Sequence, residues 1–187
     1  MTSKKNDEEF SYELKIPKDR VAVLIGTKGE TKKQIESLTK TRVNVDSKEG
    51  IVQISGTDAL AMYSAKEMIK AVGRGFNPEI AQLLLKQDYS FEILDMAAFS
   101  RNRNDDKRLK GRVIGEKGKS RRTIEELTGA YISVYGKTIG IIGEVGAVGL
   151  ARRAIESLLA GSQHANVYKW LEKQKRDMRK KEAIERV

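Results

Sequence analysis

The stretch Val21-Ala-Val-Leu-Ile-Gly-Thr-Lys-Gly29 returns later in the chain as Arg112-Val-Ile-Gly-Glu-Lys-Gly118. At a constant offset of 89 residues, which carries Gly26 onto Gly115, the segments 26–45 and 115–134 share eight identities over twenty positions. The identical pairs are Gly26/Gly115, Lys28/Lys117, Gly29/Gly118, Ile35/Ile124, Glu36/Glu125, Leu38/Leu127, Thr39/Thr128 and Val45/Val134. The chain is therefore a tandem duplication, and the repeated unit is built on Ile-Gly-x-x-Gly.

The composition points to a basic protein with a polyanionic partner. A chain of 187 residues suggests one or two domains, and the repeat favours two. Lysine and arginine outnumber aspartate and glutamate by 36 to 26, giving a net charge of +10 and a pI near 9.7. Nucleic acid is the usual partner of such a protein, although a basic pI also occurs where the charges only keep a surface hydrated.

Two absences in the sequence narrow the class of protein. The chain has no cysteine, so neither a disulfide framework nor a thiolate metal site is expected. It also has no apolar run near 18 residues and no signal-peptide pattern. We therefore expect a cytoplasmic protein that does not span a membrane.

Hydrophobic periodicity in the first copy predicts the order β-α-α-β-β-α. Residues 1–9 are polar and expected to be disordered, and the first module is predicted over residues 10–73. Alternating apolar and polar residues from Phe10 predict a half-buried strand that ends at Pro17. The other predicted elements are a helix over 18–25, the loop 26–29, a helix over 30–39, strands over 42–46 and 51–55, and a helix from Asp58 to Val72.

The second half of the chain repeats this order after a connecting segment. Residues 74–88 contain a helix start at Asn77-Pro78-Glu79 and are predicted as a short linker helix. The second module, predicted over 89–163, has an additional polar segment over 100–107 and these elements: a strand over 89–95, helices over 108–114 and 120–128, strands over 131–135 and 138–142, and a helix over 147–159. Residues 164–187 are predicted as a charged C-terminal helix that begins near Asn166 and carries Val167, Leu171, Gln174 and Met178 along one side.

A Gly-x-x-Gly corner between two helices is suited to binding a phosphate chain. Glycine lacks a Cβ atom, so it takes backbone angles that other residues avoid and lets a nucleic-acid backbone approach closely. The second helix begins at the corner, so its free N–H groups and positive dipole end face the ligand. Lys28 and Lys117 lie inside the loops, while Ile25 and Ile114 would floor a groove for unpaired bases. Because such a groove is narrow, a single strand is expected rather than a duplex.

The two copies differ in charge. Residues 18–39 contain five lysines and arginines against three acids, a net charge of +2, whereas residues 101–122 contain ten against three, a net charge of +7. Because phosphate neutralisation dominates affinity, the second module is expected to carry more of the binding, although a charged run also occurs as a merely solvated surface. The predicted RNA-binding residues are Ile25, Gly26, Thr27, Lys28, Gly29, Lys32, Lys33, Arg103, Arg112, Ile114, Gly115, Glu116, Lys117, Gly118, Lys119, Arg121 and Arg122.

Other motifs do not indicate catalysis. Gly118-Lys-Ser120 is similar to the end of a P-loop, but that motif needs a glycine five positions before its last glycine, where this chain has Val113. The single histidine, His164, has no cysteine beside it, so neither a metal site nor a catalytic triad is expected. Tyr168 and Trp170 could stack on a base, but packing of the tail helix onto the second module is favoured. We expect no enzyme activity, no cofactor and no metal.

The two loops resemble those of a known family. Leu24-Ile-Gly-Thr-Lys-Gly29 and its second copy, in the order β-α-α-β-β-α, resemble type I KH domains. The resemblance implies an α+β fold of two tandem type I KH domains with a C-terminal helix. The stretch Lys110-Gly-Arg-Val-Ile-Gly-Glu-Lys-Gly-Lys-Ser-Arg-Arg-Thr-Ile-Glu125, followed by Ile139-Gly-Ile-Ile-Gly143, is similar to archaeal relatives of the small-subunit assembly factor called partner of Nob.

That resemblance implies a role in RNA processing. It implies binding near the 3′ end of small-subunit ribosomal RNA, contact with the small ribosomal subunit, and cooperation with a PIN-domain endonuclease. Eukaryotic members tend to have a degenerate first loop, whereas Gly26-Thr-Lys-Gly29 is intact and follows the archaeal pattern. Two alternatives stay open: a KH subunit of RNA decay or translation control, and a protein-interaction scaffold whose KH folds no longer bind RNA. The lysines kept in both loops argue against the scaffold.

Overall fold

The computed structural model describes residues 10–100 and 105–185, apart from the side chains of residues 181, 182 and 185. The chain divides into two compact units between Lys86 and Gln87. The predictions made for residues 1–9, for Arg103 and for residues 186–187 lie outside the described residues.

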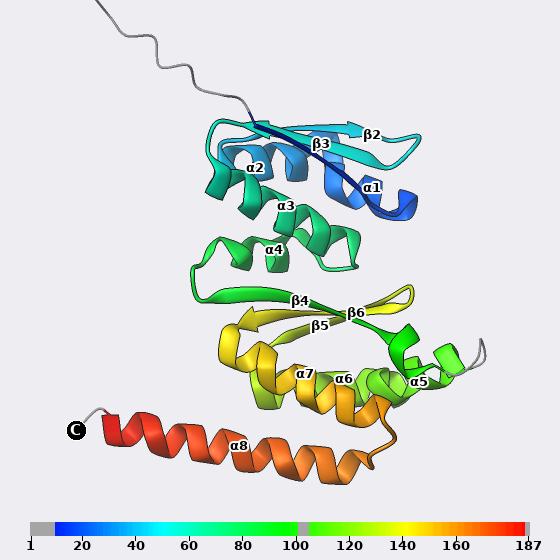
Figure 1. The fold of residues 1–187 in the computed structure, drawn as a ribbon, viewed down its shortest axis with the longest axis vertical. Helices are drawn as coiled ribbons and strands as arrows, with labels where there is room; N and C mark the ends of the chain where they lie inside the picture. The colour runs from blue at the N-terminus through cyan, green and yellow to red at the C-terminus, as the bar shows by residue number, and fades with distance from the viewer. Residues whose placement is uncertain (1–9, 101–104, 186–187) are drawn as a thin grey trace, which may run out of the picture. The chain divides into compact units, whose positions relative to one another are not determined.

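In the first unit three helices pack on one face of a three-stranded antiparallel sheet (Figure 1). The strand order β1-β3-β2 puts the last strand in the middle, so β1 and β2 form the two edges. The elements are β1 (Phe10–Lys15), α1 (Lys18–Ile25), a 3₁₀ turn (Thr27–Gly29), α2 (Glu30–Thr39), β2 (Arg42–Asp46), β3 (Ile51–Gly56) and α3 (Ala59–Gly73). The predicted order β-α-α-β-β-α is confirmed.

The core of the first unit lies between this sheet and its helices. Leu24 and Ile35 from the first two helices are fully buried with Ile54 of β3 and with Met68 and Ile69 of α3. The carboxylate of Asp58 caps α3, because it accepts hydrogen bonds from the backbone N–H groups of Leu60 and Ala61.

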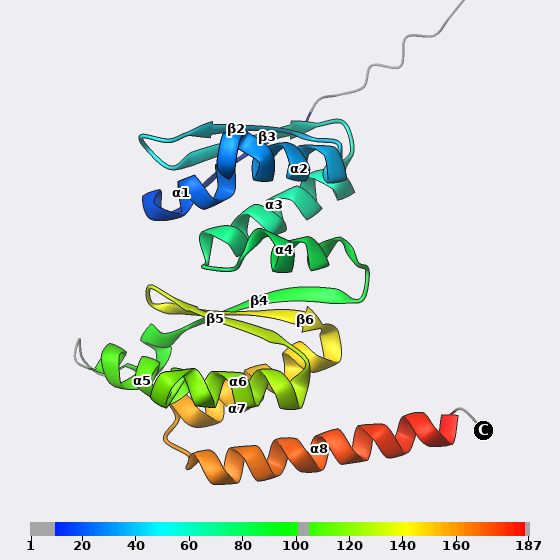
Figure 2. The ribbon, with the colours of Figure 1, turned by 180° about the vertical axis from the view of Figure 1, so that it is seen from behind.

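The second unit repeats the arrangement, with strand order β4-β6-β5 and helices on one face of the sheet (Figure 2). Its elements are β4 (Tyr89–Asp95), a 3₁₀ turn (Met96–Phe99), α5 (Asp105–Ile114), a second 3₁₀ turn (Glu116–Gly118), α6 (Lys119–Thr128), β5 (Tyr131–Tyr135), β6 (Thr138–Glu144), α7 (Val145–Leu159) and α8 (His164–Glu185). α8 packs against α6 and α7, so it completes this unit.

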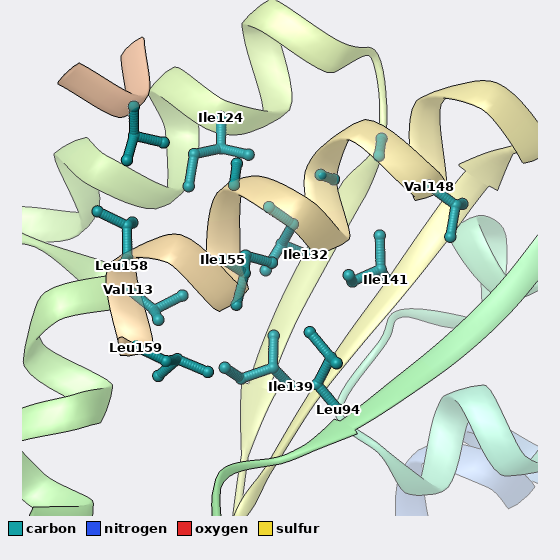
Figure 3. Close-up of a cluster of buried hydrophobic side chains, with 14 of the residues drawn as sticks. Leu94, Val113, Ile124, Ile132, Ile139, Ile141, Val148, Ile155, Leu158 and Leu159 are labelled. Atoms are coloured by element: carbon teal, nitrogen blue, oxygen red, sulfur yellow. The ribbon is translucent and has the colours of Figure 1, made fainter. Parts of the chain in front are cut away.

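The core of the second unit is drawn in Figure 3. Ile139 and Ile141 of β6 point toward Ile155 of α7, and Val113 and Ile124 close the cluster from the helices on either side of the loop. All five side chains are fully buried. The two helices that meet at Gly115–Gly118 are therefore fixed by the core directly behind the loop.

The connecting segment is helical as the sequence predicts, but only its first part is an α-helix. It forms α4 (Pro78–Ala81) followed by a 3₁₀ turn (Gln82–Leu85). Asn77 stands at the predicted cap position, but its side chain makes no capping hydrogen bond. α4 packs against α3 with Ala81 buried, so this segment belongs to the first unit.

The predicted half-buried character of β1 is wrong at its outer end. The apolar positions of the strand do share one face, but Phe10 is 47% exposed and Tyr12 is 40% exposed. Leu14 is half-buried, and burial is complete only at Ile16, beyond the end of β1. Alternation therefore gives the correct face of this strand, but it does not show how far the core extends along it.

Two helix starts differ from the prediction. α5 begins at Asp105 rather than at Arg108, so the end of the predicted polar segment forms its first turn. α8 begins at His164 rather than at Asn166, which places the histidine inside the helix instead of in a linker. The predicted stripe along α8 is buried at Val167 and Leu171. It ends at Met178, which is exposed.

The end of α2 allows a stability prediction. Lys40 has φ 53° and ψ 35°, a left-handed conformation, and the corresponding residue after α6 is Gly129 with φ 80°. A left-handed conformation costs a non-glycine residue about 1–2 kcal/mol, while glycine adds about 0.4–1 kcal/mol of unfolded-chain entropy. We expect Lys40→Gly to stabilise the first unit by roughly 0.5 kcal/mol and raise its Tm, measured by differential scanning calorimetry. Gly129→Lys should have the opposite sign, and a Tm lowered by Lys40→Gly would contradict the strain argument.

Candidate nucleic-acid interface

The two Gly-x-x-Gly loops have the same backbone conformation. The first glycines, Gly26 and Gly115, have φ 73° and 72°, each with ψ 175°. The lysines inside the loops are left-handed, with φ 52° at Lys28 and 49° at Lys117. The last glycines have φ 80° and 78°. The duplication therefore preserves a conformation in which three of the four loop residues have a positive φ, including a strained lysine in each copy.

The two glycines of a loop are needed for different reasons. A Cβ atom on Gly115 would lie 2.7 Å from the backbone nitrogen of Ser120, and one on Gly26 would lie 2.8 Å from that of Thr31. The first glycine therefore lets the chain fold closely against the next helix. A Cβ on Gly118 would meet only the guanidinium of Arg122, at 3.3 Å, so the second glycine leaves an open surface.

This open surface is the N-terminal end of α2 or of α6. No side chain among the described residues caps either helix, and the backbone N–H groups of Glu30 and Lys119 donate to the loop carbonyl oxygens of Thr27 and Glu116. Thr27 and Lys28 are exposed in the first loop, and Glu116 and Lys117 are exposed in the second. Each loop thus combines a positive helix end with an accessible ammonium group, an arrangement suited to a phosphate.

Further cations follow on the first turns of the helices. Lys33 and Arg122 run back over the second glycine of their loops, and both are exposed. Lys119 is exposed at the start of α6. The corresponding position in the first module is Glu30, which is also exposed. The second loop therefore presents three exposed cations with the carboxylate of Glu116, whereas the first has two with the carboxylate of Glu30.

Two of the predicted RNA-binding residues pack against glutamates that recur in both modules. Lys32 lies 3.8 Å from the carboxylate of Glu36, and Arg121 lies 3.7 Å from that of Glu125. Lys32 and Arg121 are half-buried. Lys32 and Arg121 therefore place positive charge beside the loops, but the glutamate one turn later neutralises part of that charge.

Arg112 has a structural contact that the sequence does not reveal. Its guanidinium donates hydrogen bonds to the carbonyl oxygens of Leu158, at 2.8 Å, and of Ser162. In the first unit Arg20 donates in the same way to the carbonyl oxygens of Val72, at 2.8 Å, and of Phe76, at 2.7 Å. Each arginine thus binds the C-terminal end of the last helix of its own module, α3 for Arg20 and α7 for Arg112, where a cation is favourable.

The isoleucines before the loops lie where a groove floor would be. Ile25 and Ile114 are half-buried, so each keeps apolar surface available beside its loop. Behind the second loop, Ser120 is buried, and its hydroxyl has no hydrogen-bond partner among the described residues. The structure therefore brings all the predicted RNA-binding residues of the described part together at two corners, with Arg112 turned toward α7.

Comparison with known proteins fits this geometry. A KH domain model matches residues 11–71, and a model of the eukaryotic type KH-domain (KH-domain type I) matches residues 90–176. The KH domain-containing protein MJ0443 of Methanocaldococcus jannaschii is 48% identical over 171 residues, which cover 89% of this chain and 75% of that protein. The chain belongs to the Dim2/PNO1 family of tandem KH-domain proteins. Its members are KH-domain RNA-binding proteins.

Solved structures of the family superimpose over most of the chain. Dim2p from Pyrococcus horikoshii OT3 has a TM-score of 0.82 at 46% identity and covers 88% of this chain and 99% of its own. The a/eIF2alpha-aDim2p-rRNA complex from the same organism gives a TM-score of 0.86 at 45% identity and covers 92% of this chain and 98% of its own.

A eukaryotic relative is similar over a shorter stretch. Pre-rRNA-processing protein pno1 of Aspergillus fumigatus is 34% identical over 116 residues, 60% of this chain and 46% of that protein.

The described part of this Dim2/PNO1 chain contains neither a membrane-spanning helix nor a metal-binding cluster. None of its helices has the length and apolarity that crossing a bilayer requires. No group of three or more histidines and carboxylates there is placed to hold a metal ion. His164 instead makes a 2.7 Å hydrogen bond between its Nε2 atom and the carbonyl oxygen of Arg112. Tyr168 and Trp170 pack against the second core, which confirms the predicted docking of the tail helix.

Proposed function

We propose that this protein binds single-stranded RNA through its two Gly-x-x-Gly loops, and that the second loop provides most of the affinity. The observation that supports this most is the repetition of one loop conformation, each copy with an uncapped helix end and an exposed lysine. A KH module clamps about four nucleotides at such a loop. The three exposed cations Lys117, Lys119 and Arg122 favour the second loop.

We further propose that the bound RNA is the 3′ end of small-subunit ribosomal RNA, during its maturation. The family membership supports this, since several relatives are pre-rRNA-processing proteins and one archaeal relative has been crystallised with rRNA. The small ribosomal subunit and a PIN-domain endonuclease are the proposed partners. The protein acts by binding and has no catalytic role in this proposal.

A second candidate function is a link to translation control. The archaeal relative crystallised with rRNA also binds a/eIF2alpha in the same complex, which favours a protein partner of that kind for this chain. Crosslinking the protein in cells and sequencing the attached RNA separates the two. Enrichment of precursor ribosomal RNA 3′ ends supports maturation, whereas enrichment of messenger RNA without precursors supports translation control.

The form of the RNA gives a direct prediction. A labelled single strand is expected to bind more tightly than a duplex of the same sequence, because the groove beside Ile25 or Ile114 admits only unstacked bases. At about −0.7 per phosphate contact, roughly three to six contacts give a log–log salt slope of roughly −2 to −4. Fluorescence anisotropy across a salt series measures both quantities.

The duplex is the matched control, since it carries the same phosphates without accessible bases. Equal affinity for the two forms, or an affinity that does not change with salt, would contradict binding at these loops.

A further inference from the structure

Three exposed aromatic side chains gather at one edge of the first unit, outside the loop. Phe10 and Tyr12 project from β1, and Tyr63 projects from the adjacent helix α3, where it is 62% exposed. Together with Met62 and Lys66 they line a hollow of about 240 Å³ between strand and helix. The apolar end of β1 that the core leaves uncovered therefore borders a shallow, solvent-open hollow.

The hollow is accompanied by positive charge. A second hollow of about 390 Å³ shares Tyr12 with the first and is lined by Lys15 and Lys70. Of the described residues that line the two hollows, none is acidic. Lys70 pairs with Glu67 at 3.1 Å, whereas the ammonium of Lys66 lies 4.0 Å above the Tyr12 ring. We call the two hollows together the β1–α3 groove.

Lys66 keeps its charge in this position. Hydrogen bonding to Tyr12 raises the pKa of Lys66 above its ordinary value, while burial acts in the opposite direction. Tyr12 and the cation above its ring line the same hollow.

The β1–α3 groove is separate from the Gly-x-x-Gly site of the same unit. β1 packs along α3 at one edge of the sheet, and β2 packs along α2 at the opposite edge. The Gly26–Gly29 loop opens at the start of α2. A strand held in the loop therefore does not fill the groove.

We propose that the β1–α3 groove is a second single-stranded RNA site, in which bases stack on Phe10, Tyr12 and Tyr63 and phosphates approach Lys15 and Lys66. Aromatic rings beside a cationic groove without carboxylates are the combination that binds single strands without sequence preference. A protein partner fits less well, because an apolar anchor segment has no need of the cationic side chains that line the two hollows. The proposal rests on the proposed RNA-binding function and gives the weakly charged first module its own part in it.

The test combines two substitutions, Tyr12→Thr and Tyr63→Gln, which keep strand and helix propensity and remove both rings. Binding of a labelled uridine oligomer, long enough for loop and groove, is measured by anisotropy. The groove variant is expected to bind roughly tenfold more weakly, because one or two bases no longer stack. Leu60→Gln is the matched control, since Leu60 is 79% exposed on the same helix but does not line the groove. It is expected to bind like the wild type.

Two further measurements report direct contact. Lys66→Gln is expected to make the log–log salt slope shallower by about 0.7, the value of one phosphate. Photo-crosslinking with 4-thiouridine in the oligomer is expected to label the peptides that contain Tyr12 or Tyr63.

The outcomes separate this proposal from the function on which it rests. Wild-type binding that the groove variant retains in full, without crosslinks at Tyr12 or Tyr63, would overturn the groove site alone. The groove site would also be overturned if the groove variant keeps its RNA affinity but no longer binds a protein partner such as purified a/eIF2alpha. Failure of the wild type to bind any single strand would overturn the groove and the loop function together.

Discussion

Lys117→Asp combined with Gly118→Asp is expected to weaken RNA binding at least several-fold more than Lys28→Asp combined with Gly29→Asp. In both cases a carboxylate replaces an ammonium at a helix end where an anion is meant to bind. The second loop is flanked by the exposed cations Lys119 and Arg122, so it is expected to bind more phosphates than the first, and its disruption removes more of the affinity.

Both double variants are expected to remain folded. Aspartate tolerates the left-handed conformation that Gly118 and Lys117 adopt better than most residues do. A side chain at Gly118 meets only the mobile end of Arg122. Circular dichroism checks the fold, and anisotropy with one labelled single strand measures affinity.

Lys40→Asp provides a matched control for these charge reversals. Lys40 is exposed and left-handed like the loop lysines, but it stands at the far end of α2. The control is expected to bind RNA nearly as well as the wild type. If the first-module pair weakens binding as much as the second, the +7 window is a solvated surface and the assignment of the main RNA contact is wrong.

The repeated residues predicted the fold because most of them have backbone or core roles. The glycines and lysines of the two loops have the same unusual angles in both copies. Ile35 and Ile124 are fully buried at equivalent places. Each of these constraints acts within a short segment, so the residue that satisfies it is identical in both copies at a constant offset.

Other identities in the repeat were visible but could not be interpreted without coordinates. Glu36 accepts a hydrogen bond from the backbone N–H of Val43 at 2.8 Å, and Glu125 accepts one from that of Ile132 at 2.8 Å. In each module this carboxylate joins the second helix to the strand that follows it, α2 to β2 and α6 to β5. Nothing in the spacing distinguishes such a bridge from an exposed charge, so the constant offset revealed the pair but not its role.

The charge count was less informative for individual residues than for the whole module. Arg112 lies in the +7 window, but its guanidinium is bound to carbonyl oxygens 46 and 50 residues away. Arg20 has the same kind of contact without a sequence match at the constant offset, since it stands about one turn earlier in its helix. Long-range contacts of this kind are set by the fold, so local sequence does not reveal them.

Gly115→Ala is expected to destabilise the second unit by about 3 kcal/mol, whereas Gly118→Ala should cost about 1 kcal/mol. The two glycines have nearly the same φ, 72° and 78°, but they differ in ψ and in space. Gly115 has ψ 175°, a region that is essentially restricted to glycine, and a Cβ there would lie 2.7 Å from the backbone nitrogen of Ser120. Relief would require α6 to shift, and its buried residue Ile124 would move with it out of its place in the core.

Urea denaturation followed by Trp170 fluorescence measures this difference. Trp170 is the single tryptophan and packs against the second core, so its signal reports this unit. Gly129→Ala is the control for left-handed strain alone, because Gly129 has φ 80° and a Cβ placed there would have no atom within 4 Å. It should cost about 1 kcal/mol, as Gly118→Ala does. If all three substitutions have equal effects, backbone strain alone explains why Gly115 is glycine, and close packing of the loop against α6 plays no part.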